Sequence, residues 1–159
     1  MRITIVCVGK IKESFYREAL AEYAKRLSKY CRFEIIEVVD EKTPEGASDA
    51  LCEHIMQKEA DRILAKIPED GYLVVTAIEG KKYDSVGFAK EIEKITVRGI
   101  NHIVFVIGGS LGIHESIKNR ADMKISFSDM TFPHQLMRVI LSEQIYRAFR
   151  IIKNEPYHK

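Results

Sequence analysis

Residues 102–112 read HIVFVIGGSLG, an apolar run followed by a turn that contains three glycines. A short, continuous apolar run that ends at glycines is typical of a strand buried on both faces of a sheet. Similar runs recur along the chain and predict strands at residues 3–8, 33–39, 72–78, 102–107 and 123–127. Because segments of helical length separate these strands, the sequence predicts an α/β fold with a mostly parallel sheet flanked by helices.

The segments between the strands carry helical signals. After the first strand, apolar residues recur at spacings of three and four, which marks one face of a helix; they are Phe15, Ala19, Leu20, Tyr23, Ala24 and Leu27. Ser48 suits the N-cap of a second helix that runs to about residue 67. Asp84 or Ser85 suits the N-cap of a third helix, which ends near Gly99.

A long helix is predicted from Pro133, whose fixed φ suits the first helical position, to about Asn154. One apolar stripe comprises Met137, Leu141, Ile145, Ala148, Phe149 and Ile152. Outside this stripe lie Leu136, Val139, Ile140, Tyr146 and Ile151. One sheet face cannot bury both sets. We therefore expect a second buried surface and favour the subunit interface of a homodimer, with a helix at the centre of a monomer as the alternative.

The composition is that of an ordinary globular protein. Of 159 residues, 46% are hydrophobic and 30% charged, and the formal net charge is +2, so any surface for a nucleic acid must be local. Cys7, Cys31 and Cys52 form no zinc motif and the histidines are scattered, so we expect no metal site. No segment suits a signal peptide or a membrane span, which predicts a cytoplasmic protein. Without repeats or linkers, we expect one domain over residues 1–159.

Three strand ends carry the residues most suited to ligand binding: residues 76–81 (TAIEGK), 107–112 (IGGSLG) and 127–135 (FSDMTFPHQ). In open α/β sheets, ligands lie beyond the carboxyl ends of the strands. Gly108, Gly109 and Gly112 allow a sharp turn and a close approach to a ligand, although such a turn alone is more often structural. The glycines match neither a P-loop nor a dinucleotide fingerprint, and the chain has no hydrolase motif.

Basic, polar and aromatic residues gather at the end of the chain: Arg147, Arg150, Asn154, Tyr157 and His158. Such a cluster can hold a polyanion, and a tyrosine ring can stack on an unpaired base. Two plainer interpretations stay open. Glu143 and Arg147 have the spacing of a solvated i,i+4 ion pair, and the tail can be frayed and without function.

Five segments, taken together and in order, carry a specific resemblance: ITIVCVGK at 3–10, FVIGGS at 105–110, MTFPHQ at 130–135, YRA at 146–148 and PYH at 156–158. The chain resembles, over essentially its whole length, the SPOUT-class methyltransferase family known as ribosomal RNA large subunit methyltransferase H. The resemblance implies a C-terminal trefoil knot, a rare feature in proteins. It also implies that S-adenosylmethionine is used to methylate N3 of a pseudouridine in 23S rRNA, on the ribosome.

The resemblance also implies where the ligands bind. Carried over by position, the contacts to the methyl donor fall on Thr76, Gly108, Phe127, Ser128, Asp129, Met130, Thr131 and Phe132. We add Gly109 and Gly112 to the expected cofactor wall because they belong to the same turn at a strand end. Thr76 stands where the family is expected to have leucine, and the contact expected at this position is apolar or through the backbone. We expect Arg147 and His158 to act on the N3 proton and the resulting anion, and Tyr157 to position the base, without a metal. The residue that accepts the proton is left open.

Two other classes of function compete with this interpretation. A non-catalytic ribosome-binding module with the same fold is the first, and the intact glycines and intact tail argue against it. A flavodoxin-like nucleotide binder is the second, and the missing phosphate motif argues against it.

Overall fold

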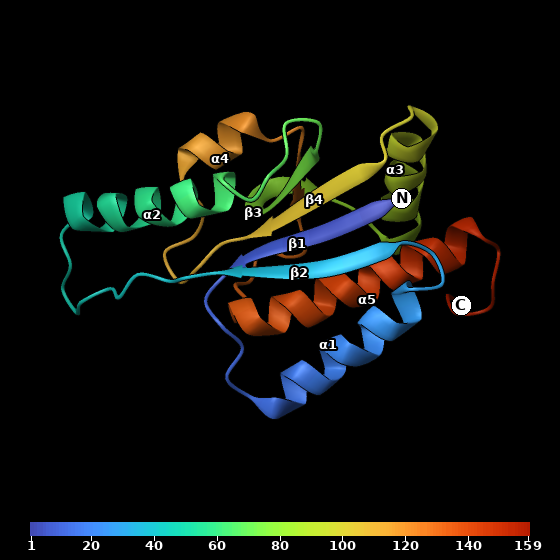
Figure 1. Cartoon of the computed structure of the whole chain (residues 1–159), viewed down its shortest axis with the longest axis horizontal. Helices are drawn as coiled ribbons and strands as arrows, with labels where there is room; N and C mark the ends of the chain where they lie inside the picture. Colours follow the sequence, from blue (N-terminus) through green and yellow to red (C-terminus); the bar gives the residue numbers. More distant parts are fainter.

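The computed structural model describes residues 1–159, in which strands and helices alternate. The elements are β1 (Arg2–Val8), α1 (Ser14–Leu27), β2 (Arg32–Val38), α2 (Asp49–Leu64), β3 (Tyr72–Lys82), α3 (Ser85–Val97), β4 (His102–Ile107), α4 (Glu115–Arg120), β5 (Met123–Ser126) and α5 (His134–Ile152). Every strand pair is parallel, and the order across the sheet is β2-β1-β4-β3-β5. The predicted parallel sheet flanked by helices is therefore confirmed (Figure 1).

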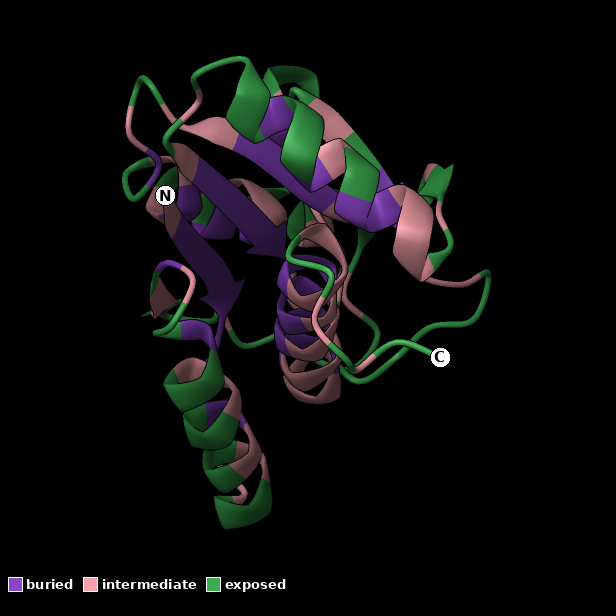
Figure 2. Cartoon of the chain, turned by 90° about the vertical axis from the view of Figure 1, so that its right-hand side faces the viewer, coloured by how far each residue is buried: buried purple, intermediate pink, exposed green.

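Helices cover both faces of this sheet (Figure 1). One face packs against α1, α3 and α5, and Ile3 and Ile5 of β1 enter that core; the other packs against α2 and α4 and receives Val6 and Val8. Alternate residues of one strand thus enter opposite cores, which is why the central strands β1 and β4 are mostly apolar. Figure 2 shows the central strands in the colour of buried residues. None of the helices is long and apolar enough to cross a membrane.

The residues predicted to start the helices agree with the structure in two cases and differ in one. Ser48 and Asp84 are N-caps, as predicted, and each side chain accepts a backbone N–H of the first turn, at 3.2 and 2.6 Å. Helix α5 begins after Pro133, as predicted, but Pro133 is its N-cap rather than its first helical residue, which is His134. The ψ angle of Pro133 is 131°, which is extended rather than helical, while its carbonyl accepts the N–H of Met137.

The strand β3 is longer than predicted and irregular at its end. Thr76 and Lys81 both pair with Ile125 of β5, so residues 77–80 bulge out of the ladder. Glycine is required at position 80, because a Cβ there would lie 2.5 Å from the carbonyl carbon of Ile125. Bulges of this kind re-aim the chain and are common beside active sites. The trefoil knot that the resemblance implies stays a prediction.

Helix α5 lies between α1 and α3 on one face of the sheet (Figure 1). Tyr146, outside the main apolar stripe, is 9% exposed, because its ring packs 6.4 Å from that of Tyr23 and 6.1 Å from that of Tyr30. The central position, which the sequence analysis favoured less, therefore accounts for part of the second apolar surface. Half-buried apolar residues remain on α5, namely Leu136, Val139, Ile140 and Ile151. The subunit interface stays a prediction.

Arg138 of α5 is fully buried. Its Nη1 donates to Oε1 of Glu37 at 2.9 Å, and its Nη2 donates to the carbonyl oxygens of Val8 at 2.6 Å and Gly9 at 2.9 Å. One guanidinium thus satisfies backbone groups at the tip of β1 and a carboxylate of β2. This contact fixes the start of α5 against the carboxyl ends of the strands.

We predict that Arg138→Ala lowers the free energy of unfolding by about 3–5 kcal/mol, because it leaves buried acceptors without their cation. Lys94→Ala is the control, since Lys94 forms an exposed pair with Glu91 and its loss should cost less than about 1 kcal/mol. Urea denaturation followed by circular dichroism measures both values. Equal losses in the two variants would contradict the role assigned to Arg138.

Candidate cofactor and substrate site

A cavity of about 350 Å³ opens where β3, β4 and β5 end. Its walls are formed by residues 76–79 in and before the bulge, 107–113 around the glycine turn, and 125–128 and 130–132 at and after β5. His134 and Met137 of α5 complete it. The sequence analysis selected the same strand ends, and the parallel sheet brings them together because the carboxyl ends of its strands share one edge.

All but one of the predicted cofactor residues line this cavity. The exception is Asp129, whose carboxylate pairs with Nζ of Lys82 at 2.5 Å and whose side chain is 79% exposed. Thr76 lines the cavity, but its hydroxyl donates to the carbonyl of Val106 at 3.0 Å. Its polar group is therefore occupied within the sheet, which fits the expected apolar or backbone contact.

The glycine turn keeps its shape because side chains would not fit within it. The N–H of Gly112 donates to the carbonyl of Gly109 at 3.1 Å, and Gly112 has a φ of +95°. A Cβ on Gly108 would lie 2.6 Å from the carbonyl oxygen of Gly112. A Cβ on Gly109 would lie 3.0 Å from the buried carboxylate of Glu59 and 3.2 Å from Val8. The glycines are thus required by the turn itself as well as by any ligand beside it.

The cavity carries little net charge. Its one carboxylate, Glu79, pairs with Nζ of Lys118 at 2.7 Å, and no lysine or arginine lines it. Burial, together with the nearby charge of Arg138, lowers the pKa of His134, so its imidazole is neutral near pH 7. No group of three or more His, Cys, Asp or Glu side chains is placed to hold a metal. Such a cavity suits an apolar or cationic ligand better than a polyphosphate.

The predicted catalytic residues meet in one cluster at the far end of α5. Cζ of Arg147 lies 4.7 Å from the ring centre of Tyr157, and Nη1 of Arg147 lies 3.3 Å from Nδ1 of His158. The ring of Tyr157 also packs edge-on against Tyr146, at 4.9 Å between centres. The structure therefore brings these residues together, and it docks the tail rather than leaving it frayed.

Further contacts hold the tail in place. Arg150 donates to the carboxylate of Glu155 and to the carbonyl of Pro156, and Lys29 and Tyr30 bind the same carboxylate. The guanidinium of Arg150 is thus engaged within the chain. Arg150 serves here to fix the tail.

Glu143 is a functional candidate that the sequence analysis considered only as one half of a solvated ion pair. Its Oε1 accepts from Nε and Nη2 of Arg147, at 3.0 and 2.7 Å, and from the hydroxyl of Tyr157 at 3.1 Å. The predicted i,i+4 pair is confirmed, but the two side chains are only 18% and 25% exposed. Burial, with the hydrogen bond to Glu143, raises the pKa of Tyr157 to about 12. The phenol therefore stays protonated at neutral pH.

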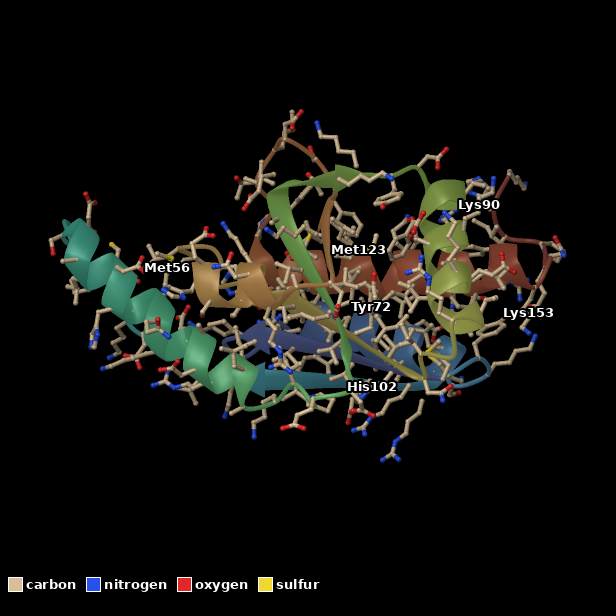
Figure 3. All side chains as sticks on the ribbon, turned by 90° about the horizontal axis from the view of Figure 1, so that it is seen from above. Met56, Tyr72, Lys90, His102, Met123 and Lys153 are labelled. Atoms are coloured by element: carbon tan, nitrogen blue, oxygen red, sulfur yellow. The ribbon has the colours of Figure 1, made fainter.

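Arg147 of the tail cluster and His134 of the candidate cofactor cavity lie at different positions along α5, whereas His158 lies closer to that cavity. Arg147 follows His134 by thirteen residues, which is about 20 Å of helix. Figure 3 shows Met56 of α2 and Lys153 at the end of α5 at opposite ends of the molecule. His158 lines a second cavity, of about 440 Å³, which shares residues 125–127 with the first. None of Arg147, Tyr157 and His158 lines the first cavity.

Comparison with known proteins assigns the chain to a class. A family model described as "Predicted SPOUT methyltransferase" matches residues 1–158, and the chain belongs to that family. Curated relatives are named ribosomal RNA large subunit methyltransferase H. The relative from Streptococcus uberis is 57% identical to this chain, that from Limosilactobacillus reuteri 55% and that from Bifidobacterium adolescentis 54%, each over 100% of both chains. The resemblance noted in the sequence is therefore confirmed.

A solved structure gives independent support for the fold. The crystal structure of tRNA (m1G37) methyltransferase from Aquifex aeolicus matches with a TM-score of 0.54, covering 92% of this chain and 70% of that one. The two sequences are 15% identical, so the likeness concerns the fold alone.

Proposed function

We propose that this chain transfers a methyl group from S-adenosylmethionine to N3 of a pseudouridine in 23S rRNA. It acts on the ribosome, in the cytoplasm, as a homodimer of single domains spanning residues 1–159. Membership of the SPOUT family supports methyl transfer, and the name of the full-length relatives supports large-subunit ribosomal RNA. The observation that carries the proposal is the nearly neutral cavity at three adjacent strand ends.

The chemistry of the cavity fits this cofactor. The glycine turn exposes backbone groups to a ligand, and apolar residues on either side offer surface for an adenine ring. With His134 neutral and no lysine or arginine among the lining residues, no side chain of the cavity wall carries a positive charge that would oppose a sulfonium. When bound, the cofactor supplies a methyl group that its cationic sulfur has already activated. The residues of the chain then have only to position N3 and control its charge.

The transfer balances without any further reactant. N3 of the base gives its proton to solvent, its lone pair forms the bond to the methyl carbon, and the carbon–sulfur bond breaks with its electron pair left on sulfur. Before the transfer, the negative charge of N3 is shared with the neighbouring carbonyl oxygens. A fixed donor aimed at one of these oxygens therefore lowers the barrier. Tyr157 offers a ring that can stack on the base.

We infer that each active site combines the cofactor cavity of one subunit with the tail of the other. Half-buried apolar residues remain along α5, and the tail leaves the end of α5 that lies away from its own cavity. A symmetric dimer uses the same patch on both subunits. If the two α5 helices run antiparallel, each tail reaches the cavity of its partner.

We predict that Gly112→Ala weakens S-adenosylmethionine binding about tenfold, because alanine at positive φ strains the turn by about 1–2 kcal/mol. Gly99→Ala is the matched control. Gly99 has a φ of +83° against +95° for Gly112, neither Cβ would have an atom within 4 Å, and Gly99 lies outside the cavity. Calorimetry measures both affinities. Unchanged affinity in Gly112→Ala, or an equal loss in Gly99→Ala, would remove this turn from the site.

The reaction itself is tested with tritiated S-adenosylmethionine and ribosomes that lack the modification, with free 23S rRNA for comparison. We expect tritium on N3 of a pseudouridine in the ribosomes. Binding to ribosomes without any transfer would instead favour the alternative, a non-catalytic ribosome-binding module.

A mixed dimer tests whether the site is shared. We predict that homodimers of Gly108→Val lose activity about 100-fold or more because they cannot bind the cofactor. Homodimers lacking residues 157–159 should lose as much because they have no tail donors. A heterodimer of the two variants contains one intact cavity beside one intact tail, so it should regain activity. Co-purified heterodimers that stay inactive, although the truncated subunit binds cofactor normally, would assign the whole site to one chain.

A further inference from the structure

The contact with Arg147 determines which nitrogen of His158 carries hydrogen. A guanidinium has donors only, so the 3.3 Å contact from Nη1 of Arg147 makes Nδ1 of His158 the acceptor. A neutral imidazole that accepts at Nδ1 carries its hydrogen on Nε2. His158 therefore presents a donor, rather than a basic nitrogen, to a ligand that approaches Nε2.

Glu143 fixes the guanidinium that makes this contact. Its Oε1 accepts hydrogen bonds from Nε and Nη2 of Arg147 at 3.0 and 2.7 Å, so Nη1 is left to contact His158. The other carboxylate oxygen of Glu143 accepts from Nε2 of Gln144 at 2.7 Å, and Gln144 in turn accepts from Ser85 of α3 at 3.0 Å. Both oxygens of Glu143 are thus held, and the orientation of Arg147 follows from them.

The same carboxylate also orients the aromatic ring beside His158. The hydroxyl of Tyr157 donates to Oε1 of Glu143 at 3.1 Å, and its ring lies under the guanidinium of Arg147. His158 itself is exposed and lines the second cavity, so its free nitrogen can meet a ligand. Glu143, by contrast, is mostly buried behind these side chains.

We propose that Glu143 is a positioning residue for methyl transfer: through Arg147 it holds His158 in the Nε2–H form, which donates to a carbonyl oxygen of the anionic pyrimidine. This inference rests on the proposed function. The N3–H bond breaks with its proton passing to water, and the charge left on the base is stabilised by the His158 donor. His158 does not take the proton.

The tautomer is tested by long-range nitrogen–proton NMR spectra of the full chain labelled with ¹⁵N-histidine. His158→Gln identifies the signals of His158. We expect the Nε2–H form in the unsubstituted protein and in the control Glu91→Leu, and a mixture of forms in Glu143→Leu. Glu91 is a matched control because it also pairs with a cation on its own helix, Lys94 at 2.8 Å. An Nδ1–H form in the unsubstituted protein would overturn the proposal.

Kinetics on ribosomes test the consequence for catalysis. We expect Glu143→Leu to lower kcat roughly 10–100-fold while KM for ribosomes and Kd for S-adenosylmethionine change less than about twofold. Glu143→Gln keeps an acceptor oxygen and should recover part of the loss, and Glu91→Leu should match the unsubstituted protein. A normal kcat in Glu143→Leu would contradict the role of Glu143.

The role of His158 as donor or base is separated by two substitutions. Glutamine has an N–H donor but no basic nitrogen, so His158→Gln should keep at least about a tenth of the activity, whereas His158→Leu should lose about 100-fold. Equal, large losses in both variants would identify His158 as the base and overturn the proposal. Absence of methyl transfer by the unsubstituted protein would contradict the proposed function instead, and the NMR result would still decide the tautomer.

Discussion

The burial of one cation, Arg138, connects the helix that carries the tail to the strands that carry the candidate cofactor cavity. Removing a guanidinium from water is costly unless acceptors surround it, and the carbonyls of Val8 and Gly9 and the carboxylate of Glu37 provide them. The start of α5 must therefore lie against the strand tips. His134, one turn before Arg138, is placed in the wall of the cavity as a result.

The direction of α5 then decides where the tail emerges. The helix has 19 residues, which is about 28 Å, and it is held between α1 and α3 along its length. Glu155 anchors the start of the tail through Lys29, Tyr30 and Arg150. A single chain thus contains two groups of candidate functional residues, one at the start of α5 and one near its end. Their separation along α5 supports a site completed by a second subunit, although His158 lines a cavity that adjoins the first one through residues 125–127 of its own chain.

The sequence predicts those features that depend on neighbours along the chain. Buried strands are apolar on both faces, Ser48 and Asp84 cap their own helices, and parallel strands must bring their carboxyl ends to one edge. The sequence does not predict features that depend on contacts between residues far apart in the chain. The bulge at 77–80 exists because Ile125 pairs with both ends of it, and Asp129 turns from the cavity because Lys82 binds its carboxylate.

The long helix and the tail illustrate the same limit. Periodicity shows that Tyr146 lies off the main apolar stripe, but only the packing of Tyr23 and Tyr30 shows what covers it. Likewise, the spacing of Glu143 and Arg147 predicts an ion pair, while its burial and its third partner, Tyr157, come from the way the tail folds back. Sequence spacing identifies a contact within a helix and cannot reveal which distant segment joins it.

The pairing of charges in the tail also bears on what the tail can recognise. Arg147 and Arg150 are both bound to carboxylates of their own chain. An unpaired arginine attracts every phosphate within about 10 Å at moderate ionic strength, so it holds an RNA backbone without regard to the base. The N–H of a neutral histidine acts only at hydrogen-bond distance and in one direction. With its arginines neutralised, the tail leaves general attraction to RNA to Lys153 and Lys159, and the N–H of His158 adds a contact that depends on the base.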